Sequence, residues 1–419
     1  MLAAFALALA QDVRISLRVD FGPIGRPAVV RELKLPRGTN LVEATRRVCS
    51  VEQDWLCCSK DDVWSIDGVG PDTRLDRYWM WNLDGAMGPN FPVKHVVSDG
   101  ERIEWLYVGG KEPVKLEARA VSLLPAATEI AIAIGAENAL VGLSHLCRQP
   151  QGRELPRVMS TTVDSDAWSM GRIDAYLREA GVRGETLYSL DEERIRELKP
   201  TVVMSQGLCP VCAATPQDVE RSLGKDKCAE LLVLTPRSLA DVAQNIRDVG
   251  KALGRESAAT IAARDFERRF EKLRTEPRAT PAPRVVVLEW FEPLWVSGEW
   301  IAEMVEVAGG TPLLAGPKDP SRRVEWAELA AADPDVIVLA ACSMDIPRAR
   351  RELGALTNHP AWTGLRAVKS RRVFLLDGER HFSTPGPGLA QGALHLRSIL
   401  RDADAARPLD SSDWVRLDS

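Results

Sequence analysis

Long apolar segments are missing from this chain of 419 residues. No stretch reaches the roughly 18 apolar residues that a membrane-spanning helix needs. An excess of positive charge is missing as well, because 54 Lys and Arg stand against 59 Asp and Glu and give a formal net charge of −5. A protein without a basic stripe has little with which to bind a phosphate backbone. The composition therefore argues against a membrane-spanning protein and against nucleic acid as a partner.

Recognisable catalytic signatures are also missing. The sequence contains no Gly-rich phosphate loop, no H-E-x-x-H zinc motif and no G-x-S-x-G nucleophile motif. Its five histidines are scattered along the chain, and a hydrogen-bonded structural histidine is the default interpretation of each: His95, His145, His359, His381 and His395. We therefore expect neither an enzyme nor a metal site.

Cysteine is scarce, with eight residues in the chain. Cys49, Cys57 and Cys58 lie close together, and one disulfide among them is plausible if the chain is exported. Cys209 and Cys212 form a single C-x-x-C pair, with no second pair and no nearby histidine to complete a zinc site. Buried structural cysteines are the favoured interpretation, and a redox role for the C-x-x-C pair is a weaker alternative.

The first ten residues are apolar and end in Ala8-Leu9-Ala10, which matches the small-residue pattern of a signal-peptide cleavage site. A positively charged segment before them is lacking. Residues 1–10 are therefore interpreted as a remnant of a signal peptide, which predicts a periplasmic or exported protein. An unrelated apolar N-terminus is the alternative.

Residues 11–112 are predicted to form a small, mostly β domain. The segment RISLRVDF alternates polar and apolar residues as a half-buried strand does, and Leu41–Cys49 is predicted to be a short amphipathic helix. The segment YWMWNLDG runs into an Asp84-Gly85 turn, which is typical of a hairpin. Arg102–Val108 is predicted to be another strand.

From Val121 onward, strands and helices alternate, which predicts parallel sheets flanked by helices. Val121–Leu124 is predicted to be a buried strand, followed by a helix that Ala127 or Thr128 caps, with Glu129 in its first turn and Gly135 at its end. This order recurs in the second half, since both Lys199-Pro200 and Asp333-Pro334 end a helix and open a strand.

The recurrence predicts two lobes, residues 118–255 and 277–402, with a tail at 403–419. Residues 256–276 form a highly charged helical pattern before a Pro-rich stretch, which suits a single helix connecting the lobes. The loops that follow the strands carry large aromatic side chains with a few polar ones. Twelve of the aromatic residues are Trp, against 4 Tyr and 8 Phe. An interlobe cleft for a bulky planar ligand is therefore expected.

Several motifs recur in the order known from one family. The segments SLLPAATEI, LVGLSHLC, LKPTVVMSQGLCPVCA, LEWFEPLWVSGEWIAEMVEVAGG and ADPDVIVLAAC resemble the cobalamin-type periplasmic binding proteins, the substrate-binding subunits of vitamin B12 and iron-siderophore importers. The resemblance covers about Val121 to Leu400. It implies the class III binding-protein fold, two α/β lobes on one connecting helix, here preceded by the β domain.

The resemblance also implies roles for individual residues. It places a set of side chains around the corrin ring: His145, Gln206, Leu208, Trp290, Phe291, Trp295 and Phe382. Trp300 and His381 follow strands in the same loops and are added as ligand-binding candidates. In this family, carboxylates on each lobe dock onto an ABC-transporter permease, and the candidates here are Asp218, Glu220, Glu299 and Glu303. The protein is expected to act as a monomer.

The β domain carries a second resemblance. Its aromatic strand, turn and W-containing strand are similar to the C-terminal domain of transcobalamin and intrinsic factor, which covers one face of cobalamin. Two resemblances to carriers of the same ligand predict a corrinoid carrier in which the loop Leu83–Phe91 acts as a lid. The D-x-H-x-x-G signature of corrinoid-dependent mutases is absent. We therefore expect cobalamin as cargo, with cobalt ligation by His95 or His145 a minor alternative and a haem or ferric-siderophore carrier the main one.

Overall fold

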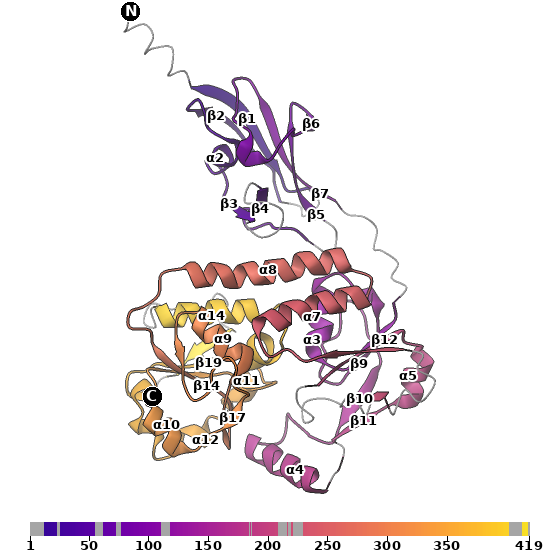
Figure 1. Cartoon of the computed structure of the whole chain (residues 1–419), viewed down its shortest axis with the longest axis vertical. Helices are drawn as coiled ribbons and strands as arrows, with labels where there is room; N and C mark the ends of the chain where they lie inside the picture. Colours follow the sequence, from indigo (N-terminus) through magenta and orange to yellow (C-terminus); the bar gives the residue numbers. More distant parts are fainter. Residues whose placement is uncertain are drawn as a thin grey trace, which may run out of the picture. The chain divides into compact units, whose positions relative to one another are not determined.

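The computed structural model describes residues 12–22, 26–54, 62–72, 77–109, 118–183, 185, 187–207, 216, 219–220, 229–401 and 413–417. The chain divides into two compact units, Met1–Lys115 and Leu116–Ser419 (Figure 1). Each unit has its own apolar core, so the two are described separately.

The N-terminal unit is built on a five-stranded sheet of order β2-β1-β7-β5-β6. Its strands are β1 (Val13–Asp20), β2 (Val29–Leu35), β5 (Arg77–Leu83), β6 (Ala86–Met87) and β7 (Arg102–Gly109), and β1 runs parallel to β7. A separate hairpin pairs β3 (Val51–Asp54) with β4 (Asp62–Ile66). The predicted alternating strand is confirmed, because every second side chain of β1, starting at Val13, is buried.

Helix α2 (Leu41–Thr45) packs into the core of this unit and is shorter than the predicted Leu41–Cys49. Asn40 caps it by accepting a hydrogen bond from the backbone of Glu43. The indole of Trp105, fully buried, donates to the hydroxyl of Thr45 at 2.8 Å and so joins the helix to the sheet. The predicted turn after β5 is confirmed, since Asp84 and Gly85 both have positive φ.

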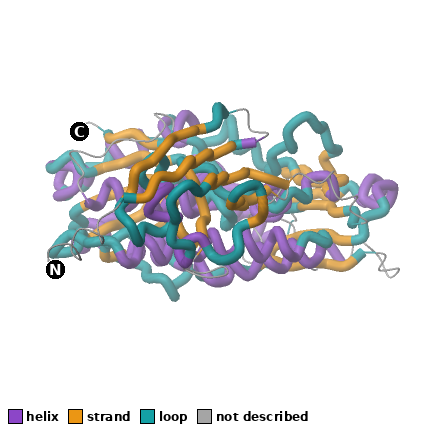
Figure 2. The backbone as a smooth tube through the Cα atoms, turned by 90° about the horizontal axis from the view of Figure 1, so that it is seen from above, coloured by secondary structure: helices purple, strands orange, loops and turns teal. Residues whose placement is uncertain are grey.

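The C-terminal unit contains two sheets with helices around them (Figures 1 and 2). The first has the order β11-β10-β9-β8-β12-β13, and all its neighbours are parallel except the edge strand β11. Its strands are β8 (Ala120–Ser122), β9 (Leu140–Ser144), β10 (Arg157–Thr161), β11 (Tyr188–Leu190), β12 (Val202–Gln206) and β13 (Glu230–Leu234). All five residues of β12 are buried, as expected for a strand covered on both faces.

The second sheet has the order β17-β15-β14-β18-β19-β20, with β16 paired to β14. Its strands are β14 (Arg284–Phe291), β15 (Leu294–Val296), β16 (Thr311–Pro312), β17 (Arg322–Arg323), β18 (Val336–Leu339), β19 (Val373–Leu376) and β20 (Trp414–Arg416). Strands β14, β18 and β19 are parallel, and β20 pairs antiparallel with β19. The two sheets form the cores of the two predicted lobes.

One long helix connects the lobes, as predicted: α8 (Glu256–Thr275) follows α7 (Leu239–Ala252) and leads into β14. A single apolar cluster contains residues of both lobes, such as Met204 and Val338, together with Phe266 and Phe270 of α8. The lobes therefore share a continuous core along α8. The other helices of this unit are α3 (Pro125–Ala133), α4 (Met170–Arg183), α5 (Glu192–Leu198), α9 (Glu299–Val307), α10 (Trp326–Ala332), α11 (Ile346–Arg350), α12 (Gly354–Thr357), α13 (Arg366–Lys369) and α14 (Leu389–Arg401).

The predicted cap of α3 is wrong. The helix begins at Pro125, since proline is well suited to the first helical position. Its N-cap is Leu124, and no side chain caps it. Glu129 therefore lies beyond the first turn, where it pairs with Arg148 at 2.8 Å. The predicted end at Gly135 is confirmed by its φ of +69°.

The recurring order of the two lobes is confirmed at one detailed point. The C-caps of α5 and α10 are Lys199 and Asp333, and both are left-handed, with φ of 45° and 39°. A proline follows each cap and then a parallel strand, β12 or β18. Both lobes therefore use the same helix-to-strand junction to bring a strand toward the cleft.

Candidate ligand-binding site

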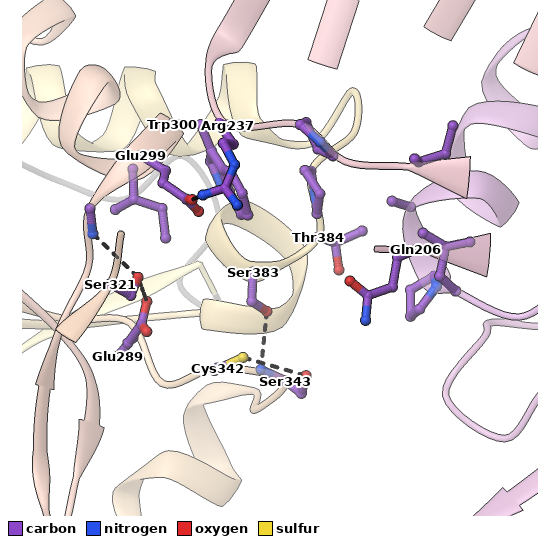
Figure 3. Close-up of a pocket in the computed structure, with 18 of the residues that line it drawn as sticks. Gln206, Arg237, Glu289, Glu299, Trp300, Ser321, Cys342, Ser343, Ser383 and Thr384 are labelled. Carbon is purple, nitrogen blue, oxygen red and sulfur yellow. Dashed lines mark hydrogen bonds and ion pairs between the residues drawn. The ribbon is translucent and has the colours of Figure 1, made fainter. Parts of the chain in front are cut away.

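A cavity of about 430 Å³ lies between the two lobes of the C-terminal unit (Figure 3). Residues that follow or end β8, β9, β12 and β13 line one side, and residues from β14, β15, α9 and the segments after β18 and β19 line the other. The cavity is thus at the carboxyl ends of the parallel strands, where ligands bind in open α/β sheets. We call this cavity the cleft.

The cleft combines flat aromatic faces with neutral polar groups. Trp295 and Trp300 line it, and the Nε1 of Trp300 donates to the carbonyl of Phe382 at 2.9 Å, which fixes that indole. The neutral polar residues of the lining are Gln206, Asn245, Ser321, Ser343, Ser383 and Thr384. Sites of this composition bind large ligands by contact area and orient them with a few hydrogen bonds.

One ion pair crosses the cleft. Nη1 of Arg237, just before α7 of the N-terminal lobe, lies 2.7 Å from Oε1 of Glu299 at the start of α9 (Figure 3). Burial raises the pKa of Glu299, and Arg237 opposes that rise. Because the Arg237 side chain is 65% exposed, solvent weakens this pair.

The entry into α9 requires a glycine. A Cβ on Gly298 would lie 2.0 Å from the carbonyl oxygen of Asp319, and that carbonyl accepts a hydrogen bond from the backbone of Glu299 at 2.9 Å. The same loop is held by Glu289, whose carboxylate accepts from the hydroxyls of Ser297 and Ser321. Close backbone contact therefore positions Glu299 and Trp300 at the cleft. Helix α9 begins at Glu299, directly after Gly298.

A second contact between the lobes lies at Glu303. Its Oε2 accepts from the backbone of Leu239, the first residue of α7, at 2.8 Å, and its Oε1 pairs with Arg274 of α8 at 2.8 Å. A carboxylate at the N-terminus of a helix is stabilised by the exposed backbone N–H groups and the helix dipole. Glu303 therefore joins α9 to α7 and α8.

A segment of the first lobe also packs against the second lobe. Residues 162–183 leave the sheet after β10 and return to β11, and we call them the crossing segment. Met170 within it is fully buried in the core of the second lobe, and its carbonyl accepts from Nε1 of Trp290 at 3.3 Å. Arg348 of α11 donates to the carbonyls of Ser165 and Trp168, at 2.9 and 2.6 Å. The lobes are therefore attached through this segment as well as through α8.

Three of the predicted ligand-binding residues line the cleft: Gln206, Trp295 and Trp300. His145 is adjacent to the lining residue Leu146, and its ring lies 6.0 Å from that of Tyr188. Burial lowers the pKa of His145, so its imidazole is neutral at pH 7. His95 is in the other unit, where its Nε2 lies 3.0 Å from the carboxylate of Glu101.

Other predicted residues are located behind the cleft wall. Trp290 and Phe291 pack against Met170 of the crossing segment, with Phe291 only 2% exposed. His381 and Phe382 are buried in the π-helix η5 (Glu379–Ser383), directly before the lining residues Ser383 and Thr384.

The remaining predicted residues are Leu208, the docking carboxylates and the cysteines. Glu220 is exposed, whereas Glu299 and Glu303 make the interlobe contacts given above. Leu208, Asp218 and the cysteines Cys57, Cys58, Cys209 and Cys212 lie outside the described residues. Cys49 and Cys147 are buried free thiols.

Several lining residues were missed from the sequence, among them Arg237, Asn245, Cys342 and Ser343. Cys342 and Ser343 directly follow Ala340 and Ala341 at the end of β18, so the rule that strand ends meet at the cleft could have found them. Asn245 lies within α7, and no local pattern distinguishes it from an exposed helix residue.

The fold and the cleft together define a bilobed solute-binding protein of class III, in which one long helix connects the lobes. The chain belongs to the periplasmic binding protein family, whose model matches residues 121–379. In the part of the chain that the structure describes, no helix has the length and apolar character to cross a membrane.

Known proteins of two kinds are similar to this chain. A vitamin B12-binding protein of Vibrio parahaemolyticus is 24% identical over 258 residues, which are 60% of this chain and 82% of the relative. Its counterpart from Vibrio cholerae is 25% identical over 253 residues, 58% of this chain and 79% of the relative. A periplasmic haem-binding protein from Pseudomonas aeruginosa has a similar structure, with a TM-score of 0.51, 21% identity and coverage of 71% of this chain and 96% of that one. The last similarity shows the fold alone.

Proposed function

We propose that this protein binds cobalamin or a related corrinoid in the cleft and delivers it to an ABC importer. Membership of the periplasmic binding protein family supports a solute receptor and not an enzyme, and an exported location. The curated relatives named for vitamin B12 binding support a corrinoid.

The observation that favours a corrinoid over haem is the chemistry of the cleft. A corrin ring carries neutral amide side chains, which match the amides and hydroxyls of Gln206, Asn245, Ser383 and Thr384. Haem carries two propionates, and its iron is usually held by His, Cys, Met or Tyr. Of the described residues lining the cleft, none is His, Met or Tyr, and the lining cation Arg237 is already paired with Glu299.

The cleft does contain one group that suits haem. Cys342 is a free, half-buried thiol in the lining, and a thiolate can bind haem iron. A haem carrier is therefore the second candidate, and a Cys342→Ser variant separates the two. Serine keeps the size and polarity of the side chain but is a poor iron ligand, so it should abolish tight haem binding and leave corrinoid binding unchanged.

The deciding experiment is a fluorescence titration of the full chain with cyanocobalamin and, separately, with hemin. Trp295 and Trp300 line the cleft, so a bound corrinoid should quench their emission in a saturable way. Trp300→Phe should reduce both the quenching and the affinity. Trp290→Phe is the matched control, because Trp290 is turned toward Met170 of the crossing segment. Saturable binding of hemin without binding of cyanocobalamin would overturn the proposal.

We further propose that the N-terminal unit contacts the ligand, as its resemblance to transcobalamin suggests. The loop Leu83–Phe91 exposes apolar side chains, with Met87 73% and Phe91 39% exposed. Exposed apolar groups of this size suit a ligand surface. Removal of residues 11–112 should weaken corrinoid binding, and an unchanged affinity of the 118–419 fragment would refute the lid.

Docking to a permease through carboxylates stays a proposal. Glu220 is exposed, which suits such a role, and Glu299 and Glu303 make the interlobe contacts described above. Glu220→Arg should reduce uptake in a reconstituted importer while corrinoid affinity stays the same. Reduced affinity for the ligand would instead assign Glu220 to the receptor itself.

A further inference from the structure

Three buried side chains that the cleft does not use converge in the second lobe. His381 is in η5, His395 is in α14 and Asp413 immediately precedes β20, and they are 4%, 2% and 6% exposed. One ligand-type atom from each lies within 4.8 Å of the other two. These residues are far apart in sequence, so the fold brings them together.

The ring of His381 has no hydrogen-bond partner. Both of its nitrogens are buried, and neither makes a hydrogen bond, although Nε2 lies 3.5 Å from Oδ1 of Asp413. Leaving a buried polar group without a partner costs about 1–3 kcal/mol. A metal ion that accepts the lone pair of one of these nitrogens would remove the cost for that nitrogen.

Each imidazole lies at a distance from the carboxylate of Asp413 that suits two ligands of one metal ion. Nε2 of His395 lies 3.4 Å from Oδ2 of Asp413, and the His381–Asp413 distance is 3.5 Å. These distances are longer than the roughly 2.7–2.9 Å of a charge-assisted hydrogen bond. Two ligands that are both about 2.1 Å from one tetrahedral zinc ion are roughly 3.4 Å apart.

We propose that His381, His395 and Asp413 form a site for a divalent transition metal, with Zn²⁺ the best match. Two imidazoles and one carboxylate are typical zinc ligands, and three protein ligands leave one position for water or another group. The amide nitrogen of Gln391 lies 3.3 Å from Nε2 of His395, and this hydrogen bond would be given up when that nitrogen binds the metal. The proposal departs from the sequence-based expectation of no metal site.

The competing interpretation is a buried ion-pair network. Nη1 of Arg380 lies 3.6 Å from Oδ1 of Asp413 and could neutralise the carboxylate without a metal. Its side chain is 64% exposed, however, so the guanidinium can turn into solvent at little cost when a metal binds.

The site would have a structural consequence for the cleft. Asp413 is held next to β19 by a hydrogen bond from the backbone of Asp377 to its carbonyl, and β20 follows it. His381 is two residues before Ser383, which lines the cleft and accepts from the backbone of Ser343 at 3.0 Å. A bound metal would therefore fix β20, α14 and one wall of the cleft together, whatever ligand the cleft takes.

The test is a titration of the chelator-treated full chain with Zn²⁺, followed by Co²⁺ as a spectroscopic probe. We expect one equivalent of Zn²⁺ with a raised Tm, and a Co²⁺ spectrum of tetrahedral nitrogen and oxygen ligation without sulfur charge-transfer bands. The nearly isosteric Asp413→Asn and His395→Gln should each lower the Zn²⁺ affinity at least tenfold, since even second-shell changes cost 10–100-fold. His359→Gln is the control, because His359 stacks on Trp326 away from the site.

Two outcomes would overturn the proposal. The first is the absence of stoichiometric Zn²⁺ binding in the full chain. The second is binding that all three variants retain equally, or that shows sulfur ligation, which would assign the metal to the cysteines. Circular dichroism of each variant checks that it folds, and the Co²⁺ spectrum of the unmodified chain decides the ligand type even if a variant does not fold.

Discussion

The buried pair Arg348–Glu352 should control the attachment of the crossing segment to the second lobe. Arg348 of α11 and Glu352, which lies just after that helix, have side chains only 8% and 9% exposed and form an ion pair. Arg348 also donates to Ser165 and Trp168, and Glu352 accepts from the backbone of Met170 at 3.0 Å. One pair of charges thus makes three of the hydrogen bonds that join the two lobes here.

Arg348→Met removes the cation but keeps much of the apolar bulk. Glu352 is then a buried carboxylate without its partner, and removing one member of a buried pair costs about 3–5 kcal/mol. The crossing segment can undock to avoid that cost, because water then reaches the carboxylate. A change of about 3 kcal/mol corresponds to a roughly 100-fold larger population of the undocked form.

Hydrogen exchange measured by mass spectrometry detects this undocking, because it reports the exchange rate of the amides in each segment of the chain. Amides of residues 162–183 should exchange up to about 100-fold faster in Arg348→Met, while amides of α8 keep their protection. Arg350→Met is the matched control, since Arg350 is exposed on the same helix. The double variant Arg348→Met/Glu352→Met should recover most of the protection, because replacing both charges of a buried pair by apolar groups is often neutral.

The reasoning would be refuted by an equal loss of protection throughout the C-terminal unit, which would mean global destabilisation without local release. It would also be refuted if the double variant were as unprotected as the single one. In that case the hydrogen bonds to Ser165 and Trp168, and not the unpaired charge, would dominate.

Three smaller predictions concern α9. Burial raises the pKa of Glu299, so its contribution to stability is fully present at low pH and is lost as pH rises through the folded pKa. Glu299→Gln should therefore be no less stable than the parent at pH 7, as measured by urea unfolding at pH 4 and 7, and a clear loss at pH 7 would contradict this. Glu303→Gln weakens the contacts to Arg274 and to the first turn of α7 and should cost about 0.5–2 kcal/mol in the same assay, whereas no loss would leave docking as its main role. Gly298→Ala should cost more than either change and reduce ligand affinity, because a Cβ would meet the carbonyl of Asp319 at 2.0 Å; an unchanged binding isotherm would contradict the need for glycine there.

The sequence predicted the strands and the long helix well because their signals are local. A strand was predicted to open after Lys199-Pro200 and β12 is Val202–Gln206, since a strand buried on both faces is a continuous apolar run. Ser238 caps α7 by accepting from the backbone of Asp241 at 3.1 Å, and a serine followed three residues later by an acidic residue is a local sign of a helix start. Capping and burial patterns depend on a few neighbouring residues, so they can be recognised without the fold.

The contacts between the lobes could not be predicted in this way. The family resemblance placed Trp290 at the ligand, but whether an indole faces a cleft or Met170 depends on where residues 162–183 fold. Glu303 looked like a surface carboxylate, and only the packing of α9 against α7 shows its bond to Leu239. Such pairings join residues more than 60 positions apart, and no spacing within one helix or strand encodes them.

The continuous core along α8 limits how the protein can signal to a transporter that a ligand is bound in the cleft. Residues of both lobes share one apolar cluster with Phe266 and Phe270, so a wide opening would expose much of that cluster to water. A receptor built this way has little freedom to signal a bound cargo by a large change of shape. A transporter would then have to recognise the loaded state from what is presented at the rim of the cleft, including the cargo's own exposed edge.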